Sequence, residues 1–443
     1  MTDSVVKYLS DRHIRFVRLL WCDNGNIIRG KAFHTGMFEE HQEHGIGISM
    51  GQQGIPATVD AVTPDSGLGP VGEVWLKPDW STLAALPYTP GHARVLADLT
   101  LNNEPWPLCP RAFLRRMVAR AEAMNLQVKA AFESEFYLLR RNPEGNIVPG
   151  DTTAFATTQA MDLHYLVIDE IAEALINQGV PVERYYPESG PGQQEITVRY
   201  GTAMQAADRH IVYRETVRGI ALRHGIVASF LPKIFADAAG SGCHLHLSLW
   251  RQDENLFPTS QGRVSPLARQ FVAGILHHLP ALMAITTPTT NSYRRLKPHY
   301  WSGAFRCWGY DNREAAVRIP GNPVPPSPTH LELKTVDASA NPYLALGAVI
   351  AAGLDGIIHQ WEPGEAIAQD PGLWSDAERE QRGIDPLPQS LGEAIAHLQQ
   401  NTLLLEALGA PLAQAFLAVR QAEWQTLKEA SLEEEVKLLV DKY

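Results

Sequence analysis

Three pairs of residues that can bind a metal ion or transfer a proton stand at spacings that bring their side chains together. They are Glu133 and Glu135, Glu188 and Glu195, and His244 and His246. Successive side chains of a β-strand point to opposite faces, so Glu133 and Glu135 are expected on the same face. Two neighbouring carboxylates repel each other, and their burial is unfavourable unless a cation lies between them. Oxygen ligands suit Mg²⁺ or Mn²⁺, so these pairs predict a divalent metal site.

Each pair also has a purely structural interpretation. A strand face with two glutamates is commonly a solvated surface, and Gly190-Pro-Gly192 is compatible with a surface hairpin. The two histidines carry more information, because His244, His246 and Ser248 share one strand face behind a Gly-Ser-Gly turn. Two imidazoles aligned with a hydroxyl group on an otherwise apolar strand favour a functional site.

A group of cationic residues follows the histidines in the sequence. Its members are Arg294, Arg295, Lys297, Arg313 and Arg318, and farther on Glu332 and Lys334 share one face of a short extended run. Surface ion pairs would explain such a group equally well when it is considered alone. Guanidinium groups, however, bind phosphates and carboxylates in a planar fork. Acids for a metal together with arginines for phosphate predict phosphoryl transfer from a nucleotide.

Composition excludes several classes of protein. The chain has 443 residues, of which 45% are hydrophobic and 20% are charged, which is typical of a globular protein with a large core. A formal net charge of −11 argues against nucleic acid or an anionic membrane as a partner. The sequence shows neither a signal peptide at its start nor an apolar run of membrane-spanning length, and we predict a cytoplasmic protein. The four cysteines are widely separated, which indicates neither a disulfide framework nor a thiolate zinc site.

The distribution of turn-forming residues predicts two domains, residues 1–104 and 105–443. The first contains a predicted hairpin of residues 14–22 and 27–33, then a stretch from Gly45 to Pro70 with too many glycines and prolines for a helix, which we interpret as a functional loop. The second contains strands that carry the acidic and histidine pairs. Helices are expected over residues 111–125, 162–179, 207–224, 390–408 and 411–443.

Six motifs in this order resemble those of the glutamine synthetase family. They are Phe132–Phe136, Glu188–Glu195, Gly240–Ser248, Asn291–Leu296, Asn312–Pro320 and Asp337–Leu344. The resemblance implies an α+β fold. It consists of a small N-terminal β-grasp domain and a glutamine synthetase/guanido kinase-like catalytic domain, in which helices flank a curved antiparallel sheet.

The resemblance also implies a role for each matching residue. It assigns to one divalent metal ion Glu135, Glu188 and Glu195, and to a second Glu133, His244 and Glu332. Binding of the amino acid substrate falls to Arg295, Lys334 and Gly240. The ATP phosphates and the transferred phosphoryl group are matched by Arg313 and Arg318, and other positions near ATP are Ser248, Tyr200 and His246. In catalysis, the implied participants are Arg313, Arg318, Glu332 and Asp60.

The sequence departs from the family pattern at the nucleophile. Members that use ammonia carry a glutamate after the Asn-Ser-Tyr motif, and here Trp301 occupies that position. A negatively charged side chain suited to ammonium is thus replaced by a large apolar ring. Ala239 replaces an asparagine beside the substrate, Lys334 and His330 replace arginines, and Asp60 is the one candidate for a second ammonium-site carboxylate.

The resemblance implies a ligase that uses Mg²⁺ or Mn²⁺ and ATP to activate the γ-carboxylate of glutamate as an acyl phosphate. The second partner is then an organic amine, as in the γ-glutamylamide synthetases, and Trp301 is expected to contact it. One alternative is a glutamine synthetase that uses ammonia, and another is a scaffold or sensor without activity. The resemblance further implies a homododecamer of two stacked hexameric rings, with sites between neighbouring subunits.

Overall fold

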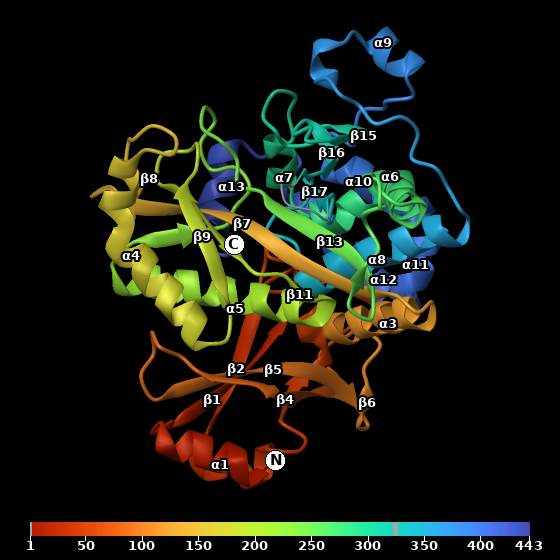
Figure 1. Ribbon diagram of the computed structural model, residues 1–443. Helices are drawn as coiled ribbons and strands as arrows, with labels where there is room; N and C mark the ends of the chain where they lie inside the picture. The colour runs from red at the N-terminus through yellow and green to blue at the C-terminus, as the bar shows by residue number, and fades with distance from the viewer. Residues whose placement is uncertain (1, 322–326) are drawn as a thin grey trace.

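The computed structural model describes residues 2–321 and 327–443, which form two units, each built on a β-sheet (Figure 1). In the N-terminal unit the strand order is β2-β1-β5-β4-β3, with β6 beside β5. The bounds are β1 (Phe16–Cys22), β2 (Ile28–His34), β3 (Ile46–Ser49), β4 (Glu73–Ala85), β5 (His92–Leu101), β6 (Glu104–Pro105), α1 (Thr2–Asp11) and α2 (Phe38–His41). The predicted β-grasp architecture is confirmed, with β1 antiparallel to β2 and parallel to β5.

Local chemistry explains the first hairpin and corrects the loop after it. Between β1 and β2 the Asp23 carboxylate accepts a hydrogen bond from the Ile27 N–H at 2.9 Å, and Asn26 adopts a left-handed φ of 62°. The stretch from Gly45 to Pro70 is only partly a loop. It contains β3 and two 3₁₀ turns, Met50–Gly54 and Pro64–Ser66, and β3 is too short for its alternation to be recognised in the sequence.

The catalytic sheet has the strand order β15-β16-β17-β13-β7-β10-β9. The short strands β8, β11 and β12 pair with β7, and β14 pairs with β13. The bounds are β7 (Gln127–Arg141), β8 (Ile147–Pro149), β9 (Val182–Pro187), β10 (Gln193–Val198), β11 (Gly201–Thr202), β12 (Val227–Ser229), β13 (Cys243–Arg251), β14 (Glu254–Asn255), β15 (Phe305–Tyr310), β16 (Ala315–Ile319) and β17 (Leu331–Leu333). The sheet is antiparallel as predicted, apart from the parallel pair β15 and β16.

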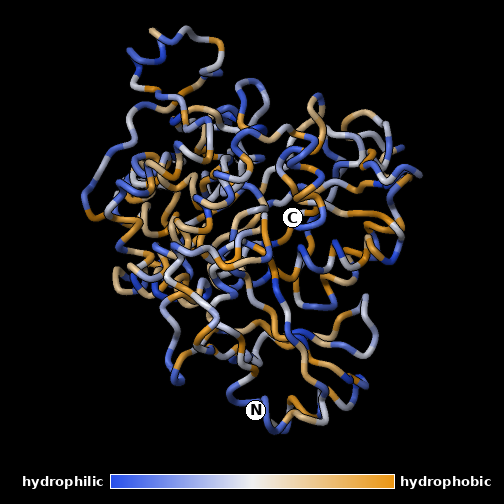
Figure 2. Tube along the Cα trace, turned by 180° about the vertical axis from the view of Figure 1, so that it is seen from behind, coloured by the Kyte–Doolittle hydropathy of each residue, from blue (hydrophilic) through white to orange (hydrophobic). Residues whose placement is uncertain are grey.

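Helices flank this sheet and join it to the N-terminal unit. Their bounds are α3 (Pro110–Ala123), α4 (Thr158–Asn177), α5 (Ala203–Arg223), α6 (Pro266–Thr286), α7 (Thr290–Arg295), α8 (Pro342–Ile358), α9 (Asp376–Gln381), α10 (Leu391–Gln400), α11 (Thr402–Leu408), α12 (Ala410–Leu427) and α13 (Leu432–Leu439). In Figure 1, α5 and α3 lie between the catalytic sheet and the N-terminal strands, and the segment with α9 projects from the opposite end. The hydropathy of the chain is mapped in Figure 2, where apolar stretches run through both units.

The predicted helices over residues 111–125, 162–179 and 207–224 are confirmed as α3, α4 and α5, within a few residues at their ends. The two predicted C-terminal helices are each divided. Asn401 ends α10 and caps α11 by accepting a hydrogen bond from the Leu404 N–H, and Ser431 starts α13 with a capping box. Within the described residues, no single helix has both the length and the apolar composition to cross a membrane. The consecutive helices α11 and α12 have that length and composition only when taken together, and they are bent by 109° relative to each other.

Candidate active site

The functional side chains form a row across five neighbouring strands of the catalytic sheet. From β10 to β7, Glu195 pairs with Glu135, and from β7 to β13, Glu133 pairs with His244. Continuing outward, His246 of β13 pairs with Glu332 of β17, which in turn pairs with Arg318 of β16. Strand register therefore brings together groups that are far apart in the sequence.

The other face of β7 belongs to the hydrophobic core. The Phe132 ring lies 4.8 Å from the His210 ring of α5, and Phe136 lies 6.3 Å from the Tyr213 ring of the same helix, between centroids. This packing fixes which face of β7 is buried against helices, and it turns Glu133 and Glu135 toward the cavity. The structure therefore confirms the side-chain alternation expected from the sequence.

Two groups of candidate metal ligands lie on this row. The carboxylates of Glu135, Glu188 and Glu195 provide oxygen atoms within 4.8 Å of one another. Atoms of Glu133, His246 and Glu332 satisfy the same limit in a second group. The first group contains the three residues predicted to bind one metal ion, and these oxygen donors suit a hard divalent cation.

Both histidines of β13 lie beside the acids of the second group, although only His246 belongs to it. The Nδ1 atom of His244 lies 3.4 Å from Glu133 Oε1 and 3.2 Å from Glu332 Oε1. The Nε2 atom of His246 lies 3.4 Å from Glu133 Oε2. The structure thus places His246, which we assigned to the nucleotide side, as close to Glu133 as His244. The assignment of His244 as the ligand stays a prediction.

The electrostatics of the first group favour a bound cation. Burial, followed by the charges of Glu133 and Glu135, raises the pKa of Glu195 to about 10. Burial and the Glu188 carboxylate raise the pKa of Glu135 to about 7. The ionised cluster is thus unfavourable without a partner, which a divalent ion would supply. The residues present therefore fit a metal ion of the kind that the sequence predicted.

The second group is balanced by cations of the protein. Burial opposes ionisation of Glu332, but Lys334 and His244 outweigh it and lower its pKa to about 2. Arg318 Nη1 lies 2.8 Å from one oxygen of Glu332, and Lys334 Nζ lies 3.3 Å from the other. Burial and Lys334 lower the pKa of His244 to about 4, so its ring is neutral near pH 7, the form that binds metals.

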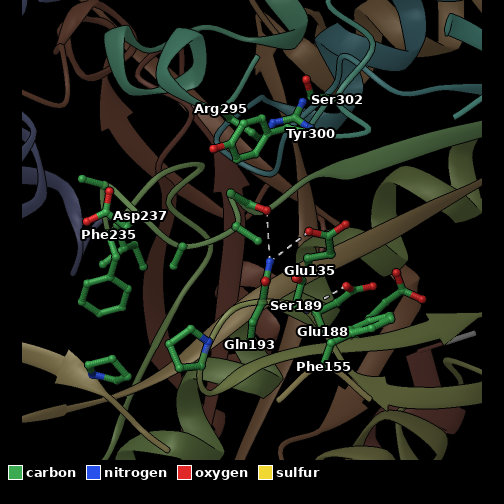
Figure 3. A pocket seen from close by; sticks show the side chains of 18 of the residues that line it. Glu135, Phe155, Glu188, Ser189, Gln193, Phe235, Asp237, Arg295, Tyr300 and Ser302 are labelled. Atoms are coloured by element: carbon green, nitrogen blue, oxygen red, sulfur yellow. Dashed lines mark hydrogen bonds between the residues drawn. The ribbon is translucent and has the colours of Figure 1, made fainter. Parts of the chain in front are cut away.

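Sequence analysis did not assign a role to Gln193, which orients a candidate ligand. Its Nε2 donates to Glu135 Oε2 at 3.0 Å, to the Gly240 carbonyl at 3.1 Å and to Ser241 Oγ at 3.2 Å. Figure 3 shows its amide pointing at Glu135, with Glu188 nearby. The signal was present in the sequence, because Gln193 stands two residues before Glu195 and so shares its strand face.

The residues predicted to bind the amino acid substrate, Arg295, Lys334 and Gly240, all line the cavity. The buried Arg295 guanidinium donates through Nη2 to the carbonyl groups of Lys334, Thr335 and Val336 at 2.6 to 3.2 Å. A Cβ atom at Gly240 would lie 2.5 Å from Arg295 Cγ and 2.7 Å from the Pro232 carbonyl oxygen, so only glycine fits there. The Ala239 carbonyl accepts a hydrogen bond from the Tyr137 hydroxyl at 2.6 Å.

A short segment that carries Trp301 borders the cavity, and we call residues 297–303 the flap. The Trp301 side chain is 59% exposed, and the Arg313 guanidinium lies 5.6 Å from the centre of its ring. The flap backbone is unusual, because His299, Trp301 and Gly303 all have left-handed φ angles, of 67°, 54° and 75°. Both Trp301 and Arg313 line the cavity, and the contact of Trp301 with the nucleophile stays a prediction.

These groups line one cavity of about 2350 Å³. It extends from the two acidic groups past Arg295 and the flap to α13, and Figure 3 shows Tyr300 and Ser302 of the flap in the same part of the view as Arg295. A cavity of this size and polarity accommodates several substrates at once.

Of the three residues predicted to lie near the nucleotide, His246 belongs to the second acidic group, whereas Ser248 and Tyr200 both contact Trp250. His246 is on β13 with Ser248, whose Oγ accepts a hydrogen bond from Trp250 Nε1 at 2.8 Å. Tyr200 stacks on Trp250 at 6.4 Å and is 52% exposed, so one of its ring faces is accessible. Asp60 is exposed in the N-terminal unit and is not among the described residues that line this cavity. A role for Asp60 in catalysis would therefore require the site of another subunit.

Comparison with known proteins supports these assignments of fold and chemistry. The glutamine synthetase N-terminal domain model matches residues 2–106, and the glutamine synthetase catalytic domain model matches residues 107–439. The chain belongs to the glutamine synthetase family. It is an ATP-dependent carbon–nitrogen ligase, and enzymes of this family use ATP and divalent metal ions.

The relatives of this chain include a γ-glutamylpolyamine synthetase and a glutamine synthetase. Gamma-glutamylpolyamine synthetase GlnA3 of Streptomyces coelicolor is 38% identical over 94% of this chain and 91% of its own length. Type-1 glutamine synthetase 1 of Dictyostelium discoideum is 36% identical over 97% of this chain and 89% of its own length. Among solved structures, a GmaS/ADP complex superimposes with a TM-score of 0.85 at 31% identity and covers 98% of this chain and 99% of its own.

Proposed function

We propose that this family member joins glutamate to an organic amine rather than to ammonia. ATP phosphorylates the γ-carboxylate of glutamate, and the amine nitrogen then attacks the acyl phosphate and releases phosphate. The single observation that carries this proposal is Trp301, which lines the cavity where ammonia-using members have a glutamate. An aromatic ring cannot accept a proton from ammonium, but it binds alkyl groups and organic cations through its face.

The remaining residues of the site supply the activation step in this proposal. Divalent ions held by the two acidic groups would neutralise the phosphates of ATP and of the group in transfer. Arg318 and Arg313 line the same cavity and offer planar donors to phosphate oxygens. Arg295 and Lys334 supply positive charge for the carboxylates of glutamate. The name of the Streptomyces relative agrees with an amine as the nucleophile.

The wider extent of the cavity also favours an amine. Besides Trp301, the wall of the cavity includes Tyr300, Phe235, Asp237 and Val436 of α13. Ammonia needs no such volume, whereas a carbon chain gains free energy when aromatic and aliphatic groups enclose it. We propose Mg²⁺ as the metal ion, with Mn²⁺ as its substitute.

A release assay for phosphate tests this function. Purified protein is incubated with ATP, Mg²⁺ and glutamate, together with ammonia or one amine from a panel of alkyl amines, ethanolamine, diamines and polyamines. We expect at least one amine to give a higher kcat/KM than ammonia. In a competition assay, Trp301→Glu should shift preference toward ammonia. If the unaltered protein uses ammonia best, it is a glutamine synthetase, and if no nucleophile supports ATP turnover, the scaffold alternative holds.

A further inference from the structure

Glu314 is a buried carboxylate that contacts the flap but, within the described residues, no candidate metal ligand. It is 5% exposed and stands in the turn between β15 and β16. Its Oε1 accepts a hydrogen bond from the Trp301 N–H at 2.8 Å, and its Oε2 accepts one from the His299 N–H at 3.2 Å. One carboxylate thus binds two backbone amides of a seven-residue segment.

These two amides belong to residues in an unfavourable conformation. His299 and Trp301 have φ angles of 67° and 54°, which L-amino acids with large side chains rarely adopt. Such a backbone persists only where surrounding groups stabilise it. Hydrogen bonds from N–H groups to an ionised acceptor are stronger than those to a neutral one, and Glu314 forms both of them at these positions.

Hydrogen bonds through Asn312 hold Glu314 in place. The Glu314 N–H donates to Asn312 Oδ1 at 3.0 Å, and Asn312 Nδ2 donates to the carbonyl groups of Ile367 and Gln369 at 2.9 Å each. A second contact joins the flap to the same neighbouring segment, since His299 Nδ1 lies 2.8 Å from Asp370 Oδ2. The inner contact through Glu314 is buried, whereas the His299 ring of the outer contact is exposed.

We infer that Glu314 is a positioning residue that sets the choice of nucleophile by holding the flap so that Trp301 faces the cavity. The inference rests on the proposed function, in that Trp301 is taken to contact the nucleophile. Loss of either hydrogen bond releases the left-handed backbone, and the Trp301 ring then leaves its place beside Arg313. Binding of ATP and glutamate depends on other strands and should be unaffected.

The test measures KM for each substrate in Glu314→Gln, which keeps the shape but replaces one acceptor oxygen with a donor. We expect KM for the best nucleophile to rise roughly tenfold, the loss typical of one hydrogen bond to a charged acceptor. The KM values for ATP and glutamate should change by less than about twofold. The matched control is Glu170→Gln, because Glu170 also contacts two groups, Arg223 and His224 at 2.7 Å each, but lies outside the cavity.

A double-mutant cycle shows whether Glu314 acts through Trp301. In a Trp301→Ala background, Glu314→Gln should have little further effect on KM for the nucleophile. An equal effect in both backgrounds, or a parallel rise of all three KM values with a lower melting temperature, would overturn the inference. Should Glu314→Gln not fold, Glu314→Asp, which keeps the charge but is one methylene shorter, serves in its place. The assay uses whichever nucleophile, amine or ammonia, gives the highest kcat/KM. The result therefore tests the role of Glu314 even if the proposed preference for an amine is wrong.

Discussion

Replacing Gln193 with leucine tests the contribution of a residue that donates a hydrogen bond to a candidate metal ligand. Gln193 Nε2 supplies one of two hydrogen bonds to Glu135 Oε2, and the other comes from the Gly242 N–H at 3.0 Å. Leucine has a similar volume but cannot donate. Glu135 Oε2 would therefore keep one of its two hydrogen bonds, and the carboxylate would be held less firmly in its orientation.

The magnitude follows from the charge on the acceptor. A hydrogen bond to a charged group contributes about 1.5 to 3 kcal/mol, and about 1.4 kcal/mol corresponds to a tenfold change in an equilibrium constant. We therefore expect Gln193→Leu to weaken Mn²⁺ binding by roughly 10 to 100-fold, the range typical of residues that orient metal ligands. Titration of metal-stripped protein with Mn²⁺, followed by calorimetry or electron paramagnetic resonance, measures this change.

The neighbouring residue provides a matched control. Gln194 is on the same strand, is fully buried on the opposite face, and neither its Nε2 nor its Oε1 has a hydrogen-bond partner among the described residues. Gln194→Leu should leave Mn²⁺ affinity within about twofold of the unaltered protein, because no ligand depends on it. Equal Mn²⁺ affinity in Gln193→Leu and the unaltered protein, or an equal loss in both variants, would refute the reasoning.

Three further outcomes are expected. Glu135→Ala should abolish ATP turnover, and Mn²⁺ soaked into crystals should bind between Glu135 and Glu195; an active variant would disprove the site. Because burial and nearby carboxylates raise the pKa of Glu195 from 4.5 to about 10, native metal-free protein retains a proton that the unfolded chain releases. The free energy of unfolding of the metal-free protein should fall by up to about 1.4 kcal/mol per pH unit from about pH 5 upward. Thermal melts with added Mg²⁺ should show this loss reversed. A melting temperature of the metal-free protein that rises with pH would contradict the prediction. Light scattering should report a closed, high oligomer, and a fully active monomer would exclude sites shared with Asp60 of a second copy.

The sequence predicted which side chains share a strand face where its signals are local. Glu133 and Glu135 share a face because a strand alternates with period two, and that face could be inferred without knowledge of the partners. Gln193 obeys the same rule relative to Glu195, but an amide attracts less notice than an acid. The choice between His244 and His246 could not be made from spacing, since both lie on one strand face and both approach Glu133.

Features that depend on contacts distant in the sequence were not predicted. Glu314 acts on backbone amides of residues 299 and 301, and no pattern in the sequence marks an amide that needs an acceptor. The break between α10 and α11 was missed because apolar periodicity continues through Asn401, although asparagine is a common capping residue. Asp60 was chosen by resemblance alone, and its position is exposed in the N-terminal unit.

The row of charged groups across the catalytic sheet has a consequence for folding. Its acids and imidazoles come from strands that are distant in the sequence, from Glu133 on β7 to Glu332 on β17. An unfolded chain does not assemble such a ligand set, so the free energy of metal binding adds to the stability of the native state alone. The pairs of β7 with β13 and of β13 with β17 also close long loops, which slows folding. Acquisition of the metal ion should therefore be among the last events of folding, and its release among the first signs of unfolding.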